Sequence, residues 1–258
     1  MDIKNIQKKK LMETKISQLQ KNGITIFSDF FSEKYCNNAI KDIENAILKY
    51  SDKMIIDKSE GTGGDIRFFK FENQFESAKT LFKNEKINSL VKKYASKDVI
   101  CHFIVAGKVE VQDGKTINSG GGWHRDSDRE QLKVMVYLNN VDNENGPFQF
   151  IKESKINDAK RQEKFQFNFE SLKKILLGIP IKNPRYSDES IENEIDKKKY
   201  KIDQIEGKKG TVIIFDGSHV HRGKNINKGV RYSYTMYFYP NTIKHLKHTE
   251  ERFGKIFL

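Results

Sequence analysis

Apolar residues recur every three or four positions in the first hundred residues, the spacing that places them on one face of a helix. Three helices are predicted in this way: residues 4–21, which Asn22-Gly23 ends, a segment capped by Ser32, and a third around residues 87–94. The apolar positions are Met12, Ile16 and Leu19; Cys36, Ile40, Ile43 and Ile47; and Ile87, Leu90, Val91 and Tyr94. A short strand at residues 24–27 separates the first two helices.

From Val99 onward the apolar period changes to two, which is typical of strands. The predicted strands are residues 99–112, 132–138, 147–151, 210–216 and 230–239, separated by turns rich in Gly, Asn and Asp. Helices followed by strands predict an α+β fold whose second half is a β-sandwich or barrel. The polar stretch 51–64 has no period and is predicted to be a loop.

A highly charged segment, residues 155–206, interrupts the predicted strands. Residues 169–177 form a predicted helix before Pro180 and Pro184, and residues 188–199 form another. An excursion of this length between core strands is often a lid or a substrate-binding insertion, and a solvated decoration is an equally good interpretation. The sequence has no internal repeat and no low-complexity linker, so a single domain over residues 1–258 is expected.

The composition excludes a disordered chain and leaves the choice of partner open. Hydrophobic residues make up 36% of the 258 residues and include 18 Phe and 10 Tyr, enough for a core. A formal charge of +12 would suit a polyanion such as nucleic acid, but only Lys8–Lys10 and Lys197–Lys199 form basic runs. Because the other basic residues are scattered, a nucleic-acid partner is not the favoured interpretation.

The context of the two cysteines and the lack of a long apolar segment favour a reducing, cytoplasmic compartment. Cys36 and Cys101 lie in apolar contexts far apart in the sequence, which favours two buried reduced thiols. The segment Met1 to Lys10 lacks an apolar signal region, and no stretch is long enough to cross a bilayer. We therefore expect a cytoplasmic protein with no membrane partner.

Candidate chemistry begins at Gly121 to Asp126. In extended backbone His124 and Asp126 point to one side, where they can bind one metal ion, although a lone pair of this kind is usually solvated. Residues 210–216 then lead to His219 and His221. Two histidines and one carboxylate form the facial triad that suits non-haem Fe(II) and leaves three positions open. Periodicity alone does not separate His219 from His221.

A candidate anion site follows on the last predicted strand. Arg231 and Ser233 alternate, so they face the same way, together with Thr235 and Tyr237. A guanidinium fork beside a hydroxyl is well suited to bind a carboxylate. The pattern predicts an anchor for the distal carboxylate of a dicarboxylic co-substrate whose other end chelates the metal.

Taken together, these motifs resemble the phytanoyl-CoA dioxygenase-like branch of the Fe(II)- and 2-oxoglutarate-dependent dioxygenases. The resemblance covers residues 16 to 240 or so and spares the charged insertion. The matching segments are Trp123-His124-Arg125-Asp126, Lys133 to Val141, Asn145-Gly146-Pro147-Phe148, Gly210 to Phe215, His221-Arg222-Gly223 and Arg231-Tyr232-Ser233.

The resemblance implies a double-stranded β-helix (jelly-roll) core with the amino-terminal helices packed on one sheet. It also implies Fe(II) held by His124, Asp126 and His221, with 2-oxoglutarate anchored by Arg231. The family places the metal histidine about ten residues before this arginine, which favours His221 over His219. Its His-x-Asp pattern likewise favours Asp126 over the nearby Asp128.

The resemblance also implies candidate contacts to the co-substrate and the substrate, on weaker sequence matches. Ser233 resembles the serine of the family's Arg-x-Ser pair, while Tyr137 and Lys133 are candidate co-substrate contacts that would otherwise serve as core and rim. Three residues flank the metal ligands and are candidate substrate contacts that would otherwise only close the mouth of the barrel: Trp123, Arg125 and Arg129.

The expected reaction is hydroxylation of an aliphatic carbon in a small or carrier-linked metabolite, with dioxygen as oxidant and release of succinate and CO2. Related halogenases carry a small residue in place of the ligand carboxylate, whereas Asp126 is present here. Desaturation, ring closure and epimerisation use the same iron chemistry. The alternatives are an oxygenase acting on a protein or nucleic acid, and a non-catalytic basic β-barrel binding module.

Overall fold

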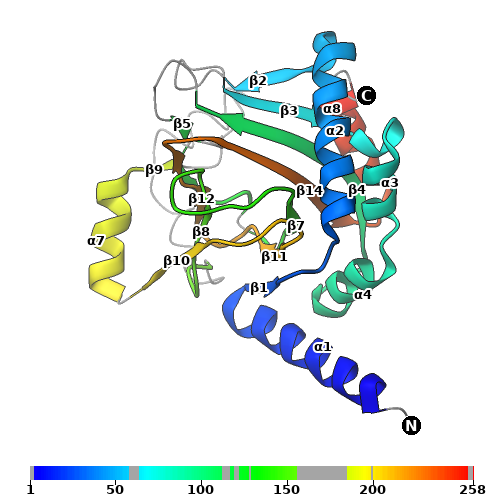
Figure 1. The fold of residues 1–258 in the computed structure, drawn as a ribbon. Helices are drawn as coiled ribbons and strands as arrows, with labels where there is room; N and C mark the ends of the chain where they lie inside the picture. Colours follow the sequence, from blue (N-terminus) through cyan, green and yellow to red (C-terminus); the bar gives the residue numbers. More distant parts are fainter. Residues whose placement is uncertain are drawn as a thin grey trace.

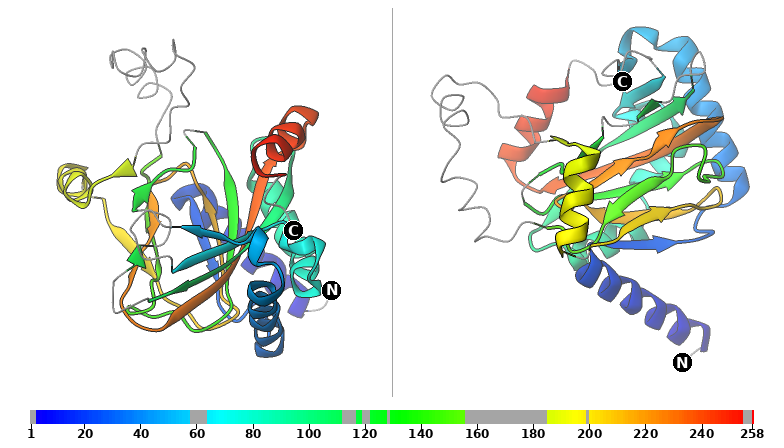
Figure 2. Two further views of the ribbon diagram at one scale, coloured as in Figure 1. Left: turned by 90° about the horizontal axis from the view of Figure 1, so that it is seen from above. Right: turned by 90° about the vertical axis from the view of Figure 1, so that its left-hand side faces the viewer.

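The computed structural model describes residues 3–57, 64–111, 117–118, 122–127, 129–155, 185–198, 200–254 and 258. Within them, two antiparallel sheets lie face to face (Figures 1 and 2). The major sheet has the order β1-β11-β7-β14-β4-β3-β2, and the minor sheet has the order β10-β8-β12-β6-β9. A third pair, β13 (Asn225–Ile226) with β5 (Ile117–Asn118), completes the described strands. The arrangement is the expected double-stranded β-helix.

The strand bounds show how the predicted segments are used. The major sheet contains β1 (Ile24–Phe27), β11 (Val212–Asp216), β7 (Leu132–Tyr137), β14 (Val230–Pro240), β4 (Val99–Glu110), β3 (Asp65–Phe69) and β2 (Ile55–Asp57). The minor sheet contains β10 (Ile202–Ile205), β8 (Phe148–Ile151), β12 (His221–Gly223), β6 (Trp123–His124) and β9 (Arg185–Tyr186). The long predicted strands therefore form the centre of the major sheet.

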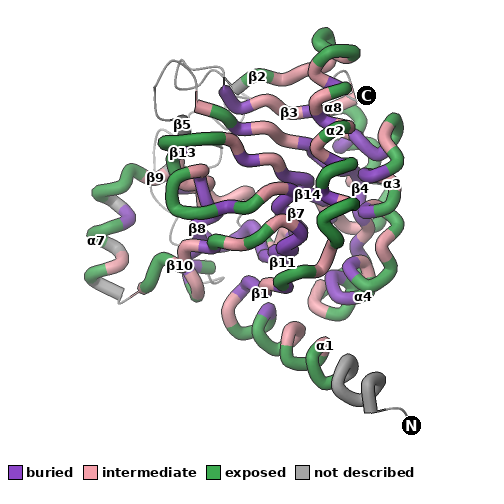
Figure 3. Tube along the Cα trace, in the orientation of Figure 1, coloured by how far each residue is buried: buried purple, intermediate pink, exposed green. Residues whose placement is uncertain are grey.

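The helices cover the outer face of the major sheet. They are α1 (Ile3–Asn22), which extends past the β1 edge of the sheet, α2 (Glu33–Lys49), α3 (Glu76–Phe82) and α4 (Glu85–Tyr94). The 3-10 turn η1 (Ser51–Lys53) follows α2, and η2 (Phe71–Asn73) precedes α3. Ser32 caps α2 by accepting a hydrogen bond from the Tyr35 amide at 3.3 Å. The predicted stripes face the sheet: Leu19, Cys36, Ile43, Ile87 and Leu90 are all buried in one cluster with the strands (Figure 3).

Strand alternation divides the major sheet into two faces with different roles. Val134, Ile214 and Met236 belong to the cluster under the helices. Ile213 and Phe215 point the other way, into a second cluster between the sheets. Lys133, Arg231 and Ser233 lie on this inner face too, so the polar positions of β7 and β14 are directed towards the minor sheet.

Two helices lie outside this layer. α7 (Asp188–Lys198) packs on the outer face of the minor sheet, where Ile191 joins a cluster with Trp123, Ile151 and Val220. α8 (Ile243–Phe253) packs through Phe253, whose ring centroid lies 5.3 Å from that of Phe69 and 5.4 Å from that of Phe103.

The structure contains strands that the sequence-based elements did not include, and two of them, β2 and β10, lie in segments for which something else was expected. Residues 51–64 were expected to be a loop, but Ile55–Asp57 form β2 against β3. Ile202–Ile205, inside the expected excursion of residues 155–206, pair with β8 in the minor sheet. Each of these strands contains only two apolar residues, adjacent in β2 and three positions apart in β10, so neither shows a period of two. Residues 156–184, including the predicted helix 169–177, lie outside the described residues.

Other expectations concern thiols and membranes. Cys36 and Cys101 are both buried free cysteines, as predicted. In the described parts of the chain, every helix is too short or too polar to cross a bilayer.

A buried carboxyl beneath the major sheet predicts a pH effect on stability. Burial raises the pKa of Glu72 from 4.5 to about 7, although its carboxylate accepts a hydrogen bond from the Ile104 amide at 2.9 Å. Because the folded-state pKa of Glu72 is raised, the contribution of this carboxyl to the free energy of unfolding is complete below pH 4.5 and is lost as pH rises through 7.

Glu72→Gln keeps a hydrogen-bond acceptor at this position but does not titrate. We expect its stability relative to wild type to increase by roughly 3 kcal/mol between pH 4.5 and 8, measured by urea unfolding; a constant difference would contradict this.

Candidate metal centre

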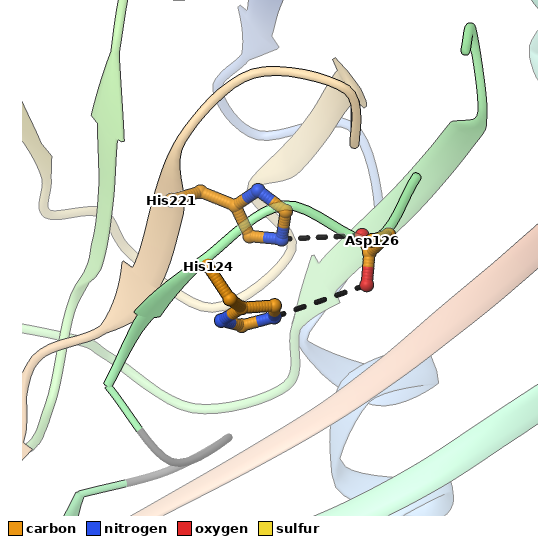
Figure 4. A group of neighbouring side chains, drawn as sticks. All are labelled: His124, Asp126 and His221. Carbon is orange, nitrogen blue, oxygen red and sulfur yellow. Dashed lines mark ion pairs between the residues drawn. The ribbon is translucent and has the colours of Figure 1, made fainter. Parts of the chain in front are cut away.

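Two neighbouring side chains, His124 and Asp126, meet the distant His221 between the two sheets. His124 on β6 pairs directly with His221 on β12, and their ring centroids are 4.6 Å apart. Asp126 follows β6, where its amide donates to the Gly217 carbonyl at 2.9 Å. One ligand atom from each of these residues lies within 4.8 Å of the others (Figure 4). Strand register, not sequence proximity, produces this cluster.

Backbone carbonyls fix how both rings point. The Nδ1 atom of His124 lies 2.8 Å from the Gly122 carbonyl, and that of His221 lies 2.8 Å from the His219 carbonyl. A carbonyl only accepts, so each Nδ1 carries a hydrogen, and in the neutral form of each ring the Nε2 presents the lone pair. These Nε2 atoms face Asp126, at 3.8 Å for His124 and 3.2 Å for His221. Two lone pairs directed at a carboxylate repel one another, and a metal cation between them turns all three into ligands.

Burial and charge maintain the protonation states that ligation needs. Burial and the neighbouring His221 lower the pKa of His124 to about 3, so its ring is neutral at physiological pH. Burial pushes the pKa of Asp126 upward, but Lys133 and His221 outweigh this and hold it well below its usual range. The cluster therefore contains a neutral imidazole at His124 and an ionised carboxylate at Asp126, donors of the kind suited to divalent iron.

Gly217 leaves the space that Asp126 occupies. A Cβ at this position would lie 2.4 Å from Asp126 Oδ2 and 3.2 Å from its Cγ. Gly217 precedes Ser218, in the turn between β11 and β12, so the turn that delivers His221 also limits where the carboxylate can lie.

Gly217→Ala is expected to displace the Asp126 carboxylate and to weaken metal binding about 10- to 100-fold, the range seen when the support of a ligand is removed. Calorimetric titration with Mn(II) measures the change. Gly229→Ala is the matched control because a Cβ there meets nothing within 4 Å, although its φ of 75° adds local strain. Equal Mn(II) affinity in wild type and Gly217→Ala would contradict the steric argument.

Arg231 lies on the same inner face, near the start of β14. It is only 4% exposed, and its Nη1 donates to the Gly146 carbonyl. Burial lowers the pKa of Arg231, while nearby Tyr137 and Asp65 act in the opposite direction. Ser233 is also buried and lies in register with Tyr137 of β7. A guanidinium this deeply buried is in the setting where a charge-assisted bond to an anion is strongest.

The two softer co-substrate candidates have defined contacts. The Tyr137 hydroxyl donates to the Ile205 carbonyl at 2.9 Å and accepts from the Phe148 amide at 2.8 Å, which ties β7 to both β10 and β8. Lys133 is directed at the metal cluster: its Nζ lies 2.7 Å from Asp126 Oδ1.

The structure places the expected flanking residues away from the ligand atoms. Trp123 is buried with α7, on the face of the minor sheet opposite His124, because neighbouring strand residues alternate. Arg125 donates to the Tyr186 hydroxyl and, at 2.6 Å, to the Ser154 carbonyl. Arg129 is exposed, and Asp128 lies outside the described residues.

His219 has a different environment from His221. Its ring packs so closely on Gly23 that a Cβ there would lie 2.4 Å from Cε1, and its centroid lies 5.2 Å from that of Phe150. Burial lowers the pKa of His219 to about 4. Among the described residues, His219 contributes its backbone carbonyl to the metal cluster, where it orients His221.

Sequence reasoning missed the supporting parts of the site. The space at Gly217 and the Lys133–Asp126 contact depend on how the chain packs across the sheets. The Gly122 and His219 carbonyls lie only two residues before the rings that they orient, but residue types do not show which way a ring points. Only the Asp216-Gly217 turn gave a signal, since a glycine between a strand and the ligand histidine indicates a close approach.

Comparison with known proteins identifies related sequences and folds. A family model described as phytanoyl-CoA dioxygenase (PhyH) matches residues 19–232. No match is found among curated proteins. The epimerase SnoN from nogalamycin biosynthesis, in complex with Fe3+, alpha ketoglutarate and nogalamycin RO, is similar with a TM-score of 0.68 and 12% identity, over 92% of this chain and 90% of that chain.

Two further solved structures have the same fold. EctD from S. alaskensis with 2-oxoglutarate and 5-hydroxyectoine has a TM-score of 0.64 and 17% identity, over 88% of this chain and 75% of that chain. HygX from Streptomyces hygroscopicus with nickel, 2-oxoglutarate and hygromycin B has a TM-score of 0.57 and 13% identity, over 88% of this chain and 87% of that chain. At these identities the likeness establishes a shared jelly-roll fold.

Proposed function

The chain belongs to the phytanoyl-CoA dioxygenase family, and on that premise we propose that it is an Fe(II)- and 2-oxoglutarate-dependent oxygenase. The observation that carries this proposal is the convergence of two histidine Nε2 lone pairs and the Asp126 carboxylate within 4.8 Å. The buried Arg231 lies on the same inner face of the barrel. We propose hydroxylation of an aliphatic carbon, with release of succinate and CO2, as the reaction.

The ligand residues fit ferrous ion better than other common metals. His124, Asp126 and His221 supply nitrogen and oxygen donors from three rigid positions and leave the remaining coordination positions open. Among the described residues, neither cysteine belongs to this cluster, whereas thiolates would favour zinc or iron–sulfur clusters. Bound there, iron supplies the activation of dioxygen that the side chains themselves cannot perform.

The protein's own contribution is binding, orientation and exclusion of water. Arg231 binds the distal carboxylate of 2-oxoglutarate, and the Ser233 hydroxyl donates to the same group. The cluster between the sheets, which includes Phe148, Phe215 and Tyr137, closes one end of the site against water. A dry, preformed site strengthens each of these charged contacts.

A small-molecule substrate is supported by the structural relatives. SnoN, EctD and HygX are each described with a small organic molecule, nogalamycin RO, 5-hydroxyectoine and hygromycin B respectively. The change in mass between substrate and product distinguishes the reaction outcomes, because hydroxylation adds one oxygen atom and epimerisation leaves the mass unchanged.

The test uses the purified full-length chain with its metal removed by chelation. Anaerobic addition of Fe(II) and 2-oxoglutarate should give the weak visible charge-transfer band of the chelate, and admission of oxygen should release succinate. A metabolite screen scored by succinate release and product mass then identifies the substrate. Wild-type protein that gives neither band nor succinate would overturn the proposal; salt-dependent binding to DNA or RNA without iron affinity would favour a binding module instead.

A further inference from the structure

A buried ammonium group touches the carboxylate of the metal cluster. Lys133 is 6% exposed, and its Nζ lies 2.7 Å from Asp126 Oδ1. A buried lysine is uncommon because the charge loses its hydration, so it is found where a specific anion stabilises it. Here that anion is itself a candidate metal ligand, which gives the lysine a direct electrostatic effect on whatever the site binds.

Aromatic rings limit where this ammonium can move. The Lys133 Nζ lies over the ring of Tyr237, 4.3 Å from its centroid, and Tyr237 stacks on Phe103 with centroids 4.9 Å apart. Lys133 and Tyr237 are also direct partners in the β7–β14 ladder. A cation held by a carboxylate on one side and a supported ring on the other keeps its position when the site is loaded.

The consequence follows from the signs of the charges. Asp126 and Lys133 offset each other, so the histidine–aspartate cluster with its lysine has no net negative charge to attract a divalent cation. A positive charge within a few ångströms of a buried site repels a dication and attracts a dianion. The two ligands of the proposed reaction have these opposite charges.

We propose that Lys133 is a charge-balancing residue that weakens binding of the metal ion alone and strengthens binding of the dianionic 2-oxoacid to the metal-loaded protein. This inference rests on the proposed function and extends it, because it names the residue that sets the relative affinities for the two ligands. A residue that merely held Asp126 in position would act differently, since its loss would weaken the metal site itself.

The experiment compares two affinities in Lys133→Met, which keeps the length of the side chain and removes its charge. Calorimetry gives the Kd for Mn(II) on chelator-treated protein and then the Kd for 2-oxoglutarate on the Mn(II)-loaded protein. We expect Mn(II) to bind several-fold more tightly, and 2-oxoglutarate to bind about tenfold more weakly, than to wild type. Lys133→Arg keeps the charge and should change both constants less than Lys133→Met does.

Lys155→Met is the matched control. Lys155 pairs with a different buried carboxylate, Asp216, at 3.1 Å, and this carboxylate lies outside the metal cluster. The control should leave both constants near those of wild type. Lys133→Gln provides a second neutral side chain with the same expectation, should Lys133→Met fold poorly by circular dichroism.

The changes in the two dissociation constants of Lys133→Met show which role Lys133 has. Opposite shifts in the two constants support the charge-balancing role. Two constants that both weaken, or that both stay unchanged, overturn it and leave the proposed function intact. If the wild-type protein bound no Mn(II), the proposed function would be wrong and the inference about Lys133 would fail with it. The wild-type titration therefore distinguishes failure of the proposed function from failure of the inference.

Discussion

Asp126→Ala is expected to abolish metal binding and succinate release together. The carboxylate is the only charged ligand in the cluster, and both Nε2 atoms are directed at it, at 3.8 Å and 3.2 Å. Without it, the ammonium of Lys133 has no carboxylate to offset its charge, and it repels a dication. We expect the Mn(II) affinity to fall by at least 100-fold, beyond the 10- to 100-fold typical of a supporting residue, as measured by calorimetric titration of chelator-treated protein.

The same change also removes the partner of a buried cation, so folding must be measured beside binding. Breaking a buried ion pair from one side costs about 3 kcal/mol or more, which urea unfolding should detect in Asp126→Ala. The double variant Asp126→Ala/Lys133→Met should recover most of that stability without recovering metal binding. Asp203→Ala serves as the remote control, because Asp203 lies on β10 and its ion pair with Lys152 is more exposed. Metal affinity retained in both Asp126 variants would rule this carboxylate out as a ligand.

The sequence predicted those parts of the fold that have a long period. The helices that carry Leu19, Ile43 and Leu90 and the strands β4, β7 and β14 all repeat apolar residues over enough positions for the period to be clear. β2 and β10 contain two apolar residues each that do not alternate, so they could not be recognised, whereas the equally short β1 could. Pairing order was likewise hidden, because hydrogen bonds between strands leave no local mark on the sequence.

The candidate site divides in the same way. His124, Asp126 and His221 could be predicted because a short motif and a spacing to Arg231 identify them, and the structure brings these three together. The directions of the neighbouring side chains could not. Trp123 and Arg125 flank the ligands in sequence but contact α7, Tyr186 and Ser154, because adjacent residues of an extended segment face opposite ways. A motif thus predicts which side chains converge better than it predicts where their sequence neighbours point.

Arg231→Met is expected to raise the Kd and KM for 2-oxoglutarate about 100-fold while leaving the Mn(II) affinity of the protein within a few-fold of wild type. A bidentate, charge-assisted contact to a carboxylate is strong in a buried site, and the guanidinium is 4% exposed. Two hydrogen bonds to a charged group contribute about 1.5–3 kcal/mol each, and part of that sum is offset by the cost of burying the cation. Titration of Mn(II)-loaded protein with 2-oxoglutarate, with succinate release as a second measurement, gives both constants.

A loss of 2-oxoglutarate affinity without a loss of Mn(II) affinity would distinguish Arg231 from a residue that only stabilises the fold. Arg231→Lys keeps the charge but not the planar fork and should fall between wild type and Arg231→Met. Lys108→Met is the matched control: Lys108 lies opposite Tyr232 on the neighbouring strand β4 and pairs with Glu44 at 3.0 Å beneath the helices, away from the inner face. It should lose some stability and no co-substrate affinity. If Arg231→Met lowered the Mn(II) and 2-oxoglutarate affinities equally, Arg231 would be supporting the fold of the barrel. Loss of a residue that only anchors the co-substrate carboxylate should leave the metal affinity unchanged.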